Sequence, residues 1–325
     1  MSPQTPTLNT LPPPPPGRTG WPWTEASPLL PETMPDGQPW PRISIVTPSY
    51  NQGQFIEETI RSVLLQGYPN LEYIIIDGGS TDESVEIIRK YEPWLAYWVS
   101  EKDRGQAHGL NKGFAQTSGA IMAWINSDDL YLPGAFQAVG EIFAAYPDLV
   151  WLTSGMPSEC DEQTRVVLNY ASGFSSRFFS VAGYLGHLYS SGWIQQESTF
   201  WRRELWQQGG GTIDETMTLA LDFELWSRFF CHSPLAVVQA PLGCFRFHNG
   251  QRSRAFMERY VAEGMRCLGL KGPIWLEGVA RIYKHLRLYH IFPWQKVVKW
   301  LYGEQVMVIY PGGVGSWKQQ RQKRA

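Results

Sequence analysis

The chain has 325 residues, a formal net charge of -2, 43% hydrophobic residues and 18% charged residues. This composition is typical of a folded globular protein and excludes a largely disordered chain. The charge lacks the basic excess of nucleic-acid-binding proteins, so we expect no nucleic-acid partner. No apolar run predicts a transmembrane helix, the N-terminus has no signal-peptide pattern, and the four cysteines form no Cys-x-x-Cys pair, so we expect a cytoplasmic protein.

Residues 1–41 are rich in proline, with 13 of the chain's 24 prolines and the unbroken run Pro12–Pro16. Proline fixes φ and lacks a backbone N–H, so such a segment favours polyproline II over helix or sheet. We expect residues 1–41 to form a disordered or loosely draped tail. A proline motif that binds a partner protein is the alternative.

Strand-like apolar segments alternate with helix-like amphipathic segments between residues 42 and 146. Predicted strands begin near residues 42, 71, 95 and 120, and predicted helices cover residues 55–66, 82–92, 107–117 and 132–146. This alternation predicts parallel βαβ units with right-handed crossovers in an α/β fold. The second half is less regular, and we interpret "LVWLTSG", "TRVVLNY", "LDFELWSRFF" and "PLAVVQAPLGCFRFH" as a mixed continuation of the same sheet.

A polar cluster follows each of the first four predicted strands: Pro48–Asn51, Asp77–Ser80, Asp103–Gln106 and Asn126–Asp129. In parallel sheets, ligands bind beyond the carboxyl ends of the strands. We therefore expect the four clusters to converge on one site at one edge of the sheet.

Two adjacent carboxylates, Asp128 and Asp129, follow the fourth predicted strand. They would repel each other there, and a bound divalent cation would relieve that repulsion. Mg²⁺ and Mn²⁺ prefer such oxygen ligands and commonly share them with substrate phosphates. A helix N-cap explains at most one of the two acids. Neither a Gly-x-Gly-x-x-Gly motif nor a P-loop is present, which disfavours those two classes of nucleotide site.

Four segments together resemble the family 2 glycosyltransferases: "ISIVTPSYNQGQFIEETIRSVLLQGYP", "EYIIIDGGSTDES", "SEKDRGQAHGLNKGFAQTSG" and "AWINSDDLYLPGA". The resemblance covers roughly residues 42–250. It implies the GT-A fold, a Rossmann-like α/β/α sandwich with a mostly parallel central sheet. It also implies a nucleotide-sugar-binding half at residues 42–150 and an acceptor-binding half at residues 151–250.

The resemblance also implies a reaction. An inverting enzyme of this family would transfer a hexosyl or related sugar from a nucleotide-diphosphate sugar to an acceptor hydroxyl, assisted by a divalent metal, Mg or Mn. The donor-binding positions that match the family are Pro48, Tyr50, Asn51, Asp77, Asp103, Lys112, Asn126, Ser127 and Asp128. For Asp77, a turn acid before two glycines is the alternative.

The family's D-x-D-like motif falls on Asn126, Ser127 and Asp128, where the first acid is replaced by an amide. Asp128 is therefore the expected metal ligand, and the donor phosphates would hold much of the metal. We expect Asp129 to support the site or to cap the next helix.

Two later segments, "QQESTFWRRELWQQGGG" and "LALDFELWSRF", resemble the acceptor-side and base-bearing parts of the family. They imply that Gln196, Glu197 and Trp201 contact the sugar or the acceptor. They also imply that Asp222 is the catalytic base. Glu224 lies two residues further on, so only one of these two acids should face the site if the segment is helical.

The segment "RFHNGQRS" resembles the family's R-x-H element, in which the histidine reaches the diphosphate or the metal. By this resemblance His248 joins Asp128 as a metal ligand, and Arg246 or Arg252 assists. A histidine that simply packs in the core or on the surface is the alternative.

Residues 251–325 are expected to form a helical, basic, Trp-bearing extension. Residues 281–325 hold nine Lys and Arg against one acid, Glu304. The segment "WQKVVKWLYGEQVMVIY" could lie at a membrane surface, because interfacial helices combine Trp with basic residues. A C-terminal helix packed on the domain is the alternative.

These patterns predict an enzyme of polysaccharide biosynthesis in the cell envelope. Its donor would be a UDP-, dTDP- or GDP-linked sugar, and its acceptor a carbohydrate or a lipid-linked molecule at the inner face of the membrane. The alternative is a catalytically silent protein of the same fold that binds sugars or a partner. A nucleotidyltransferase would need a Gly-rich, basic loop after the first strand, and "VTPSYNQGQF" does not supply one.

Overall fold

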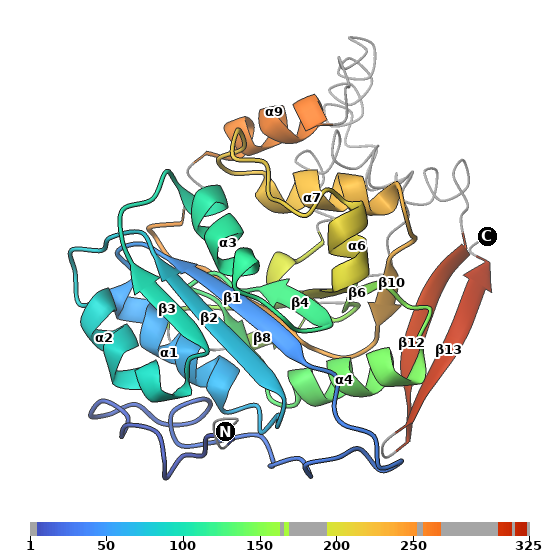
Figure 1. The fold of residues 1–325 in the computed structure, drawn as a ribbon, viewed down its shortest axis with the longest axis horizontal. Helices are drawn as coiled ribbons and strands as arrows, with labels where there is room; N and C mark the ends of the chain where they lie inside the picture. Colours follow the sequence, from blue (N-terminus) through green and yellow to red (C-terminus); the bar gives the residue numbers. More distant parts are fainter. Residues whose placement is uncertain are drawn as a thin grey trace.

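The computed structural model describes residues 5–162, 166–168, 194–251, 256–267, 305–313 and 316–323. It confirms the strand–helix alternation predicted for residues 42–146 (Figure 1). These elements are β1 Ile43–Ser49, α1 Gly53–Leu64, β2 Leu71–Asp77, α2 Ser84–Tyr91, η1 Glu92–Trp94, β3 Tyr97–Ser100, α3 Gln106–Ala115, β4 Ile121–Trp124, β5 Leu130–Tyr131 and α4 Ala135–Ala145. The short elements η1 and β5 were not predicted.

The second half contains shorter strands and helices, as its irregular pattern indicated. They are β6 Trp151–Ser154, β7 Ser158–Cys160, β8 Val166–Leu168, η2 Gln196–Ser198, β9 Thr199–Arg202, α6 Arg203–Gln208, α7 Leu221–Phe230, β10 Ala236–Val238, β11 Gly243–Arg246, α9 Met257–Cys267, β12 Gln305–Gly313 and β13 Ser316–Lys323. The helix expected from "LDFELWSRFF" is α7, which carries Asp222 in its first turn.

Nine strands of the described residues form the central sheet, in the order β13-β12-β10-β6-β9-β4-β1-β2-β3. Strands β4, β1, β2 and β3 are parallel, as are β6, β10 and β12. Strand β9 is antiparallel to β4 and β6, and β13 is antiparallel to β12. In Figure 1, α3, α6 and α7 lie over one face of this sheet, and α1, α2 and α4 lie over the other. The predicted α/β/α sandwich with a mostly parallel sheet is confirmed.

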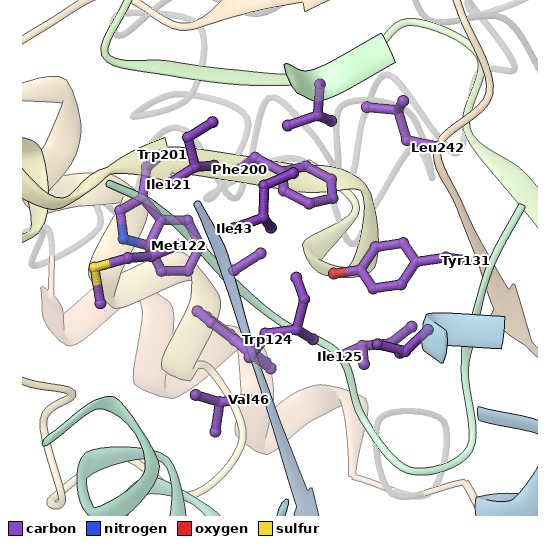
Figure 2. Close-up of a cluster of buried hydrophobic side chains, with 14 of the residues drawn as sticks. Ile43, Val46, Ile121, Met122, Trp124, Ile125, Tyr131, Phe200, Trp201 and Leu242 are labelled. Carbon is purple, nitrogen blue, oxygen red and sulfur yellow. The ribbon is translucent and has the colours of Figure 1, made fainter. Parts of the chain in front are cut away.

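A buried aromatic cluster joins the two halves of the sheet. Trp124 of β4 stacks on Trp226 of α7, with ring centroids 5.7 Å apart. Trp201 of β9 meets Trp124 edge to face at 5.6 Å and also contacts Trp226. Figure 2 shows Trp124 and Trp201 among the aliphatic side chains of β1 and β4. Much of the chain's aromatic content therefore builds the core under the carboxyl end of β4, which is where the predicted site begins.

The proline-rich segment is packed on the domain, so the expectation of a disordered tail is wrong for residues 5–41. Trp23 and Trp40 are buried. Arg61 of α1, which is fully buried, donates hydrogen bonds to the carbonyl oxygens of Pro12, Pro22 and Trp23 at 2.8 to 3.0 Å. A buried guanidinium needs partners for its N–H groups. Carbonyl groups of this segment serve as those partners, a role that the proline pattern of the sequence did not indicate.

The C-terminal expectation is partly wrong. Residues 305–313 and 316–323 form the antiparallel pair β12–β13 rather than a helix, and β12 pairs in parallel with β10. The preceding part of the predicted interfacial segment, like Arg252, lies outside the described residues. Within the part of the chain that the structure describes, no helix is long and apolar enough to cross a membrane.

Candidate active site

The polar clusters at the ends of the first strands meet at one edge of the sheet, as predicted. The backbone N–H of Asn51 donates to Ser80 Oγ at 2.8 Å, and Asn51 Oδ1 accepts from the N–H of Thr81 at 2.9 Å. Across the same edge, Gln106 Nε2 donates to Asn126 Oδ1 at 2.7 Å. The loops after β1, β2, β3 and β4 are therefore joined by hydrogen bonds into one rim.

The β1 end offers an exposed aromatic face. Tyr50 is 60% exposed, although it directly follows the buried strand that contains Pro48. Asn51 has a positive φ of 51°, a conformation that asparagine tolerates better than most residues. The turn directs the chain away from the sheet and leaves Tyr50 available to a flat ligand. Contact between these three residues and a nucleoside stays a prediction.

Asp77 is fully buried at the end of β2 and holds the turn that follows it. Its carboxylate accepts hydrogen bonds from the N–H groups of Gly79 and Ser80 and from the hydroxyls of Ser80 and Ser100, at 2.5 to 3.1 Å. These contacts support the turn-acid alternative. Direct contact between Asp77 and a nucleoside stays a prediction.

Asp103 lies against two glycines that leave room for its carboxylate. A Cβ atom on Gly78 would stand 2.7 Å from Asp103 Oδ2, and one on Gly109 would stand 3.2 Å from the same oxygen. Asp103 is thus brought beside the β2 end, as the donor-site prediction requires. Lys112 of α3 forms an ion pair with Glu101 on the same side of the sheet.

The turn after β4 separates its two carboxylates. Asp129 is 1% exposed and accepts from the N–H of Arg246 at 2.9 Å and from Asn126 Nδ2 at 3.2 Å. Burial raises the pKa of Asp129, and the neighbouring charges of Asp128 and Glu197 add to the rise. The side chain of Asp128 is 20% exposed. Asp129 therefore supports the turn, and Asp128 is the acid that faces outward.

His248, which follows β11, contacts Asp128. Its Nε2 lies 3.0 Å from Asp128 Oδ2, and its ring packs on Phe55 with centroids 4.6 Å apart. The N–H of Gly250 donates to Nδ1 of His248 at 3.2 Å. That contact assigns the Nε2–H tautomer to the neutral ring, so Nε2 donates to the carboxylate. The structure thus brings together the two residues assigned to the metal, and metal binding by them stays a prediction.

A buried ion pair that was not predicted fixes this arrangement. Arg246 Nη2 lies 2.8 Å from Glu58 Oε2 of α1, and both side chains are buried. Arg246 Nε also donates to the carbonyl oxygen of Asp128 at 2.7 Å, and Trp23 Nε1 donates to Glu58 at 3.1 Å. Arg246 thus assists by shaping the turn around Asp128. The residues involved are so far apart in the sequence that no local pattern could have indicated Glu58.

Asp222 is held in the first turn of α7, partly buried, and accepts a hydrogen bond from Tyr260 Oη at 2.9 Å. Burial raises the pKa of Asp222 to about 6. Glu224 instead pairs with Arg228 one turn along, at 2.7 Å. The two acids thus have different partners, and the raised pKa of Asp222 would suit a general base. That Asp222 alone faces the substrate stays a prediction.

Glu197 is near enough to both Asp222 and Asp128 for their charges to act on it. Burial raises its pKa to about 8, and the charges of Asp222 and Asp128 add to the rise. The carboxyl groups of Asp128, Glu197 and Asp222 are therefore near one another. Near neutral pH the buried carboxyl of Glu197 is largely protonated. Oε1 of Glu197 has no hydrogen-bond partner among the described residues.

The comparisons with known proteins agree with this geometry. Residues 44–203 match the family model described as "Glycosyl transferase family 2". The chain belongs to the family 2 glycosyltransferases. A glycosyltransferase of Nostoc sp. without a characterised function is 31% identical over 105 residues, which is 31% of this chain and 33% of that protein. TuaG of Bacillus subtilis, named as a glycosyltransferase of teichuronic acid biosynthesis, is 38% identical over 92 residues, 27% of this chain and 36% of that protein.

The chain thus spans about a third of the length of these curated relatives. The glycosyltransferase also shares its fold with TarS of S. aureus, crystallised with UDP-GlcNAc. The TM-score is 0.55 at 18% identity, and the likeness covers 70% of this chain and 65% of the crystallised TarS chain, residues 1–349. This likeness confirms the GT-A type of fold.

One acceptor-side assignment in this glycosyltransferase is wrong. Trp201 is fully buried in the aromatic cluster and cannot contact a sugar there. Its neighbour Gln196 is also buried and donates from Nε2 to the carbonyl oxygen of Trp124 at 2.5 Å. Because aromatic residues serve sugar sites and cores alike, sequence could not separate the two roles. Contact between the acceptor and Gln196 or Glu197 stays a prediction.

Asp128 and His248 fit one edge of the coordination sphere of a divalent metal. Their facing atoms are 3.0 Å apart, and two ligands on adjacent octahedral positions are separated by about 3 Å when each bond is about 2.1 Å. Within the described ranges, no group of three or more His, Cys, Asp or Glu side chains could hold a metal ion. Phosphate oxygens and water would have to complete the shell, as expected from Asn126 in place of an acid.

Proposed function

We propose that this glycosyltransferase transfers a sugar from a nucleotide-diphosphate sugar to an acceptor hydroxyl, with inversion at the anomeric carbon. The observation that carries the proposal is the placement of Asp128, Glu197 and Asp222. Burial raises the pKa of Glu197, and the charges of Asp222 and Asp128 add to the rise, which supports a location of the three carboxyl groups near one another. The rim of β1 to β4 loops lies beside them and would take the nucleotide.

Asp222 acts as the general base in this proposal. It removes the proton of the acceptor hydroxyl while the hydroxyl oxygen bonds to the anomeric carbon. The bond from that carbon to the donor phosphate breaks, and the nucleoside diphosphate leaves with the bonding electrons. One displacement inverts the configuration and needs no carboxylate nucleophile. A pKa near 6 keeps Asp222 ionised at neutral pH and still able to hold the proton.

The other residues stabilise the leaving group. A divalent metal bound at Asp128 and His248 would supply charge stabilisation for the departing diphosphate. Coordination through Nε2 would require the neutral ring to carry its proton on Nδ1, so Nδ1 would no longer accept from the N–H of Gly250. Asn126 contributes no charge here, and Arg246 holds the turn rather than the substrate because its guanidinium is committed to Glu58 and the Asp128 carbonyl.

We propose a UDP-, dTDP- or GDP-linked donor and a carbohydrate or lipid-linked acceptor of a surface polysaccharide. A UDP-linked sugar is the first donor to test because TarS, which has the same fold, was crystallised with UDP-GlcNAc. The name of TuaG motivates the polysaccharide context. A membrane contact through residues beyond 281 is part of the same proposal.

The experiment that tests the donor class is a thermal-unfolding screen with UDP, dTDP, GDP and ADP, each with and without Mn²⁺. A nucleotide at 100 times its Kd should add about 2.7 kcal/mol to the free energy of unfolding. That corresponds to roughly 5–10 °C in a domain of this size. One base should give the largest shift, and Mn²⁺ should increase it. If no nucleotide shifts the midpoint under either condition, the proposal fails.

The second candidate is a catalytically silent sugar-binding protein, and Asn126 favours it because the motif's first acid is missing. Turnover separates the two candidates. A silent protein would bind a nucleotide or sugar and release no nucleoside diphosphate from any donor, whereas an enzyme would release it in a manner that depends on Asp222.

A further inference from the structure

Helix α9, Met257–Cys267, lies beyond the family match and contacts the start of α7, which carries Asp222. In Figure 1 the two helices lie side by side at the upper edge of the molecule. Tyr260 of α9 is 9% exposed, and its hydroxyl donates to Asp222 Oδ1 at 2.9 Å. The proposed base is therefore held by a side chain from an element that the family motifs do not include.

A second residue of α9 holds the backbone just before Asp222. The carboxylate of Glu263 is 1% exposed and accepts hydrogen bonds from the N–H groups of Thr218, Leu219 and Ala220 at 2.9 to 3.2 Å, and from the Thr218 hydroxyl at 2.6 Å. These hydrogen bonds lower the pKa of Glu263 to about 2. The carboxylate thus satisfies the N–H groups that precede α7, where a negative charge is favourable.

A third position brings the two helices close together. A Cβ atom on Gly264 would lie 3.1 Å from the ring of Phe223, so glycine permits this approach. Positions 263 and 264 follow position 260 by three and four residues, so both lie on the face of α9 that carries Tyr260. That face contacts the Thr218–Phe223 segment three times, on each side of Asp222 as well as at Asp222 itself.

The acidic groups around Asp222 make an uncharged hydrogen-bond donor, the hydroxyl of Tyr260, important for holding its carboxylate. Burial raises the pKa of Glu197 of η2, and the charge of Asp222 adds to the rise, so these two acids are near each other. On the other side stand the hydroxyl of Tyr260 and, beyond that hydroxyl, Glu263 and Cys267 of α9. Nε of Arg259 lies 3.3 Å from Oε1 of Glu263, so the ion pair of Arg259 is with Glu263. Burial raises the pKa of Tyr260, so its hydroxyl keeps its proton and donates at neutral pH.

We propose that Tyr260 and Glu263 are positioning residues for the reaction: Tyr260 fixes one oxygen of Asp222 so that the other receives the acceptor proton, and Glu263 fixes the turn from which Asp222 projects. This inference rests on the proposed function, because it assigns the orientation of the proposed base. It adds α9 to the part of the chain that the active enzyme needs.

The test is Tyr260→Phe, which removes the hydroxyl and keeps the ring. A hydrogen bond to the ionised form lowers a carboxyl pKa, so its loss should raise the pKa of Asp222 by roughly one unit. The acidic limb of the kcat/KM profile should move to higher pH by that amount, with about a tenfold loss below the limb and an unchanged KM for the donor. Tyr146→Phe is the matched control, because it removes a hydroxyl that donates to the Trp317 carbonyl far from Asp222.

A second measurement does not depend on activity. In protein labelled with ¹³C at the aspartate carboxyl carbon, the Asp222 signal is the one that Asp222→Asn removes. Its titration midpoint should rise in Tyr260→Phe and stay in place in Tyr146→Phe. An unmoved midpoint overturns the inference, even if activity falls evenly at all pH values. A moved midpoint in a protein that turns over no donor would confirm the Tyr260–Asp222 hydrogen bond but overturn the proposed function, and with it the role of Tyr260 in the reaction.

Glu263→Gln gives an independent result. The amide removes the charge and one acceptor oxygen, so the Thr218–Ala220 turn should loosen. We expect a lower kcat and a lower unfolding midpoint, with the donor-induced thermal shift retained. Wild-type kcat in a destabilised Glu263→Gln protein would overturn the part of the inference that concerns Glu263.

Discussion

Nε2 of His248 lies 3.0 Å from Oδ2 of Asp128, although 120 residues separate them. The contact joins the turn after β4 to the segment after β11. It is supported from below by Phe55, which packs on the imidazole and also lies 5.1 Å from the guanidinium of Arg246. One face of α1 therefore fixes the pair before any ligand binds, which is the condition for a preorganised phosphate site.

Asp128→Asn should weaken Mn²⁺ binding in the presence of the preferred nucleoside diphosphate. The change removes a charged oxygen ligand, and losses of about 10–100-fold in metal affinity are typical even for outer-shell partners. Isothermal titration of Mn²⁺ into the nucleotide complex measures it. Asp148→Asn, at an exposed position, should leave the affinity unchanged. Equal Mn²⁺ affinity in Asp128→Asn and wild type would remove Asp128 from the metal site.

The Glu58–Arg246 pair should be costly to break. Glu58→Gln leaves the buried guanidinium without its counter-charge, and such a change lowers the free energy of unfolding by about 3–5 kcal/mol. Denaturation by urea measures it. The exposed pair of Arg104 and Glu215 gives the control, since Glu215→Gln should cost about 1 kcal/mol or less. Similar small losses in both variants would show that the buried pair does not hold the turn.

The proline-rich segment should contribute to stability. Trp23 is 5% exposed, and Trp23→Ala should lower the free energy of unfolding by about 3–5 kcal/mol, as large core truncations do. Leu29→Ala in the same segment is the control, because Leu29 is 59% exposed. Limited proteolysis should cleave Trp23→Ala within residues 5–41 sooner than wild type. Rapid cleavage of wild type at these residues would contradict the packing described here.

Asp222 should reduce stability at neutral pH. Its pKa is about 6 in the folded protein and 3.8 when unperturbed, so the folded state binds the proton more tightly than the unfolded state does. Asp222 therefore costs no stability below pH 3.8, where it is protonated in both states, and its cost grows as pH rises to about 6 and is complete above it. This cost amounts to about 3 kcal/mol. Asp222→Asn should therefore be more stable than wild type by about 2–3 kcal/mol at pH 7.5 and should lose this advantage toward pH 4. Urea denaturation at both pH values checks the prediction, and a variant less stable than wild type at pH 7.5 would contradict it.

The nucleotide-binding half was predictable because its signals are local. The strand and helix periods between residues 42 and 146 place Asn51, Asp77 and Asn126 at strand ends, and parallel topology then brings those ends together. The resemblance to the family assigned Asp222 and His248 to the site, because the segments that contain them follow one another in the family's order. Each of these inferences needs only residues that are close in sequence or motifs in a fixed series.

The rest depends on contacts that leave no local trace. In the sequence Glu58 is an ordinary helix acid, and its partner Arg246 lies 188 residues away. Tyr260 lies beyond the matched motifs. A tryptophan such as Trp201 can pack in a core or line a sugar site, and the sequence alone does not distinguish the two. The β12 strand was missed because Trp and Lys before it suggested a helix, whereas Val306 and Val308 favour a strand and pairing with β10 decides the outcome.

Asp222 is proposed to be the base of a sugar transfer. The most direct test of this role is the release of nucleoside diphosphate from a panel of UDP-, dTDP- and GDP-sugars by wild type, Asp222→Asn and Glu224→Gln. We predict turnover in wild type and in Glu224→Gln, because Glu224 faces Arg228 instead of the site. Asp222→Asn should keep the donor-induced thermal shift and lose about 10²–10⁴-fold in turnover. Wild-type turnover in Asp222→Asn, or no turnover in wild type with any donor it binds, would contradict the claim.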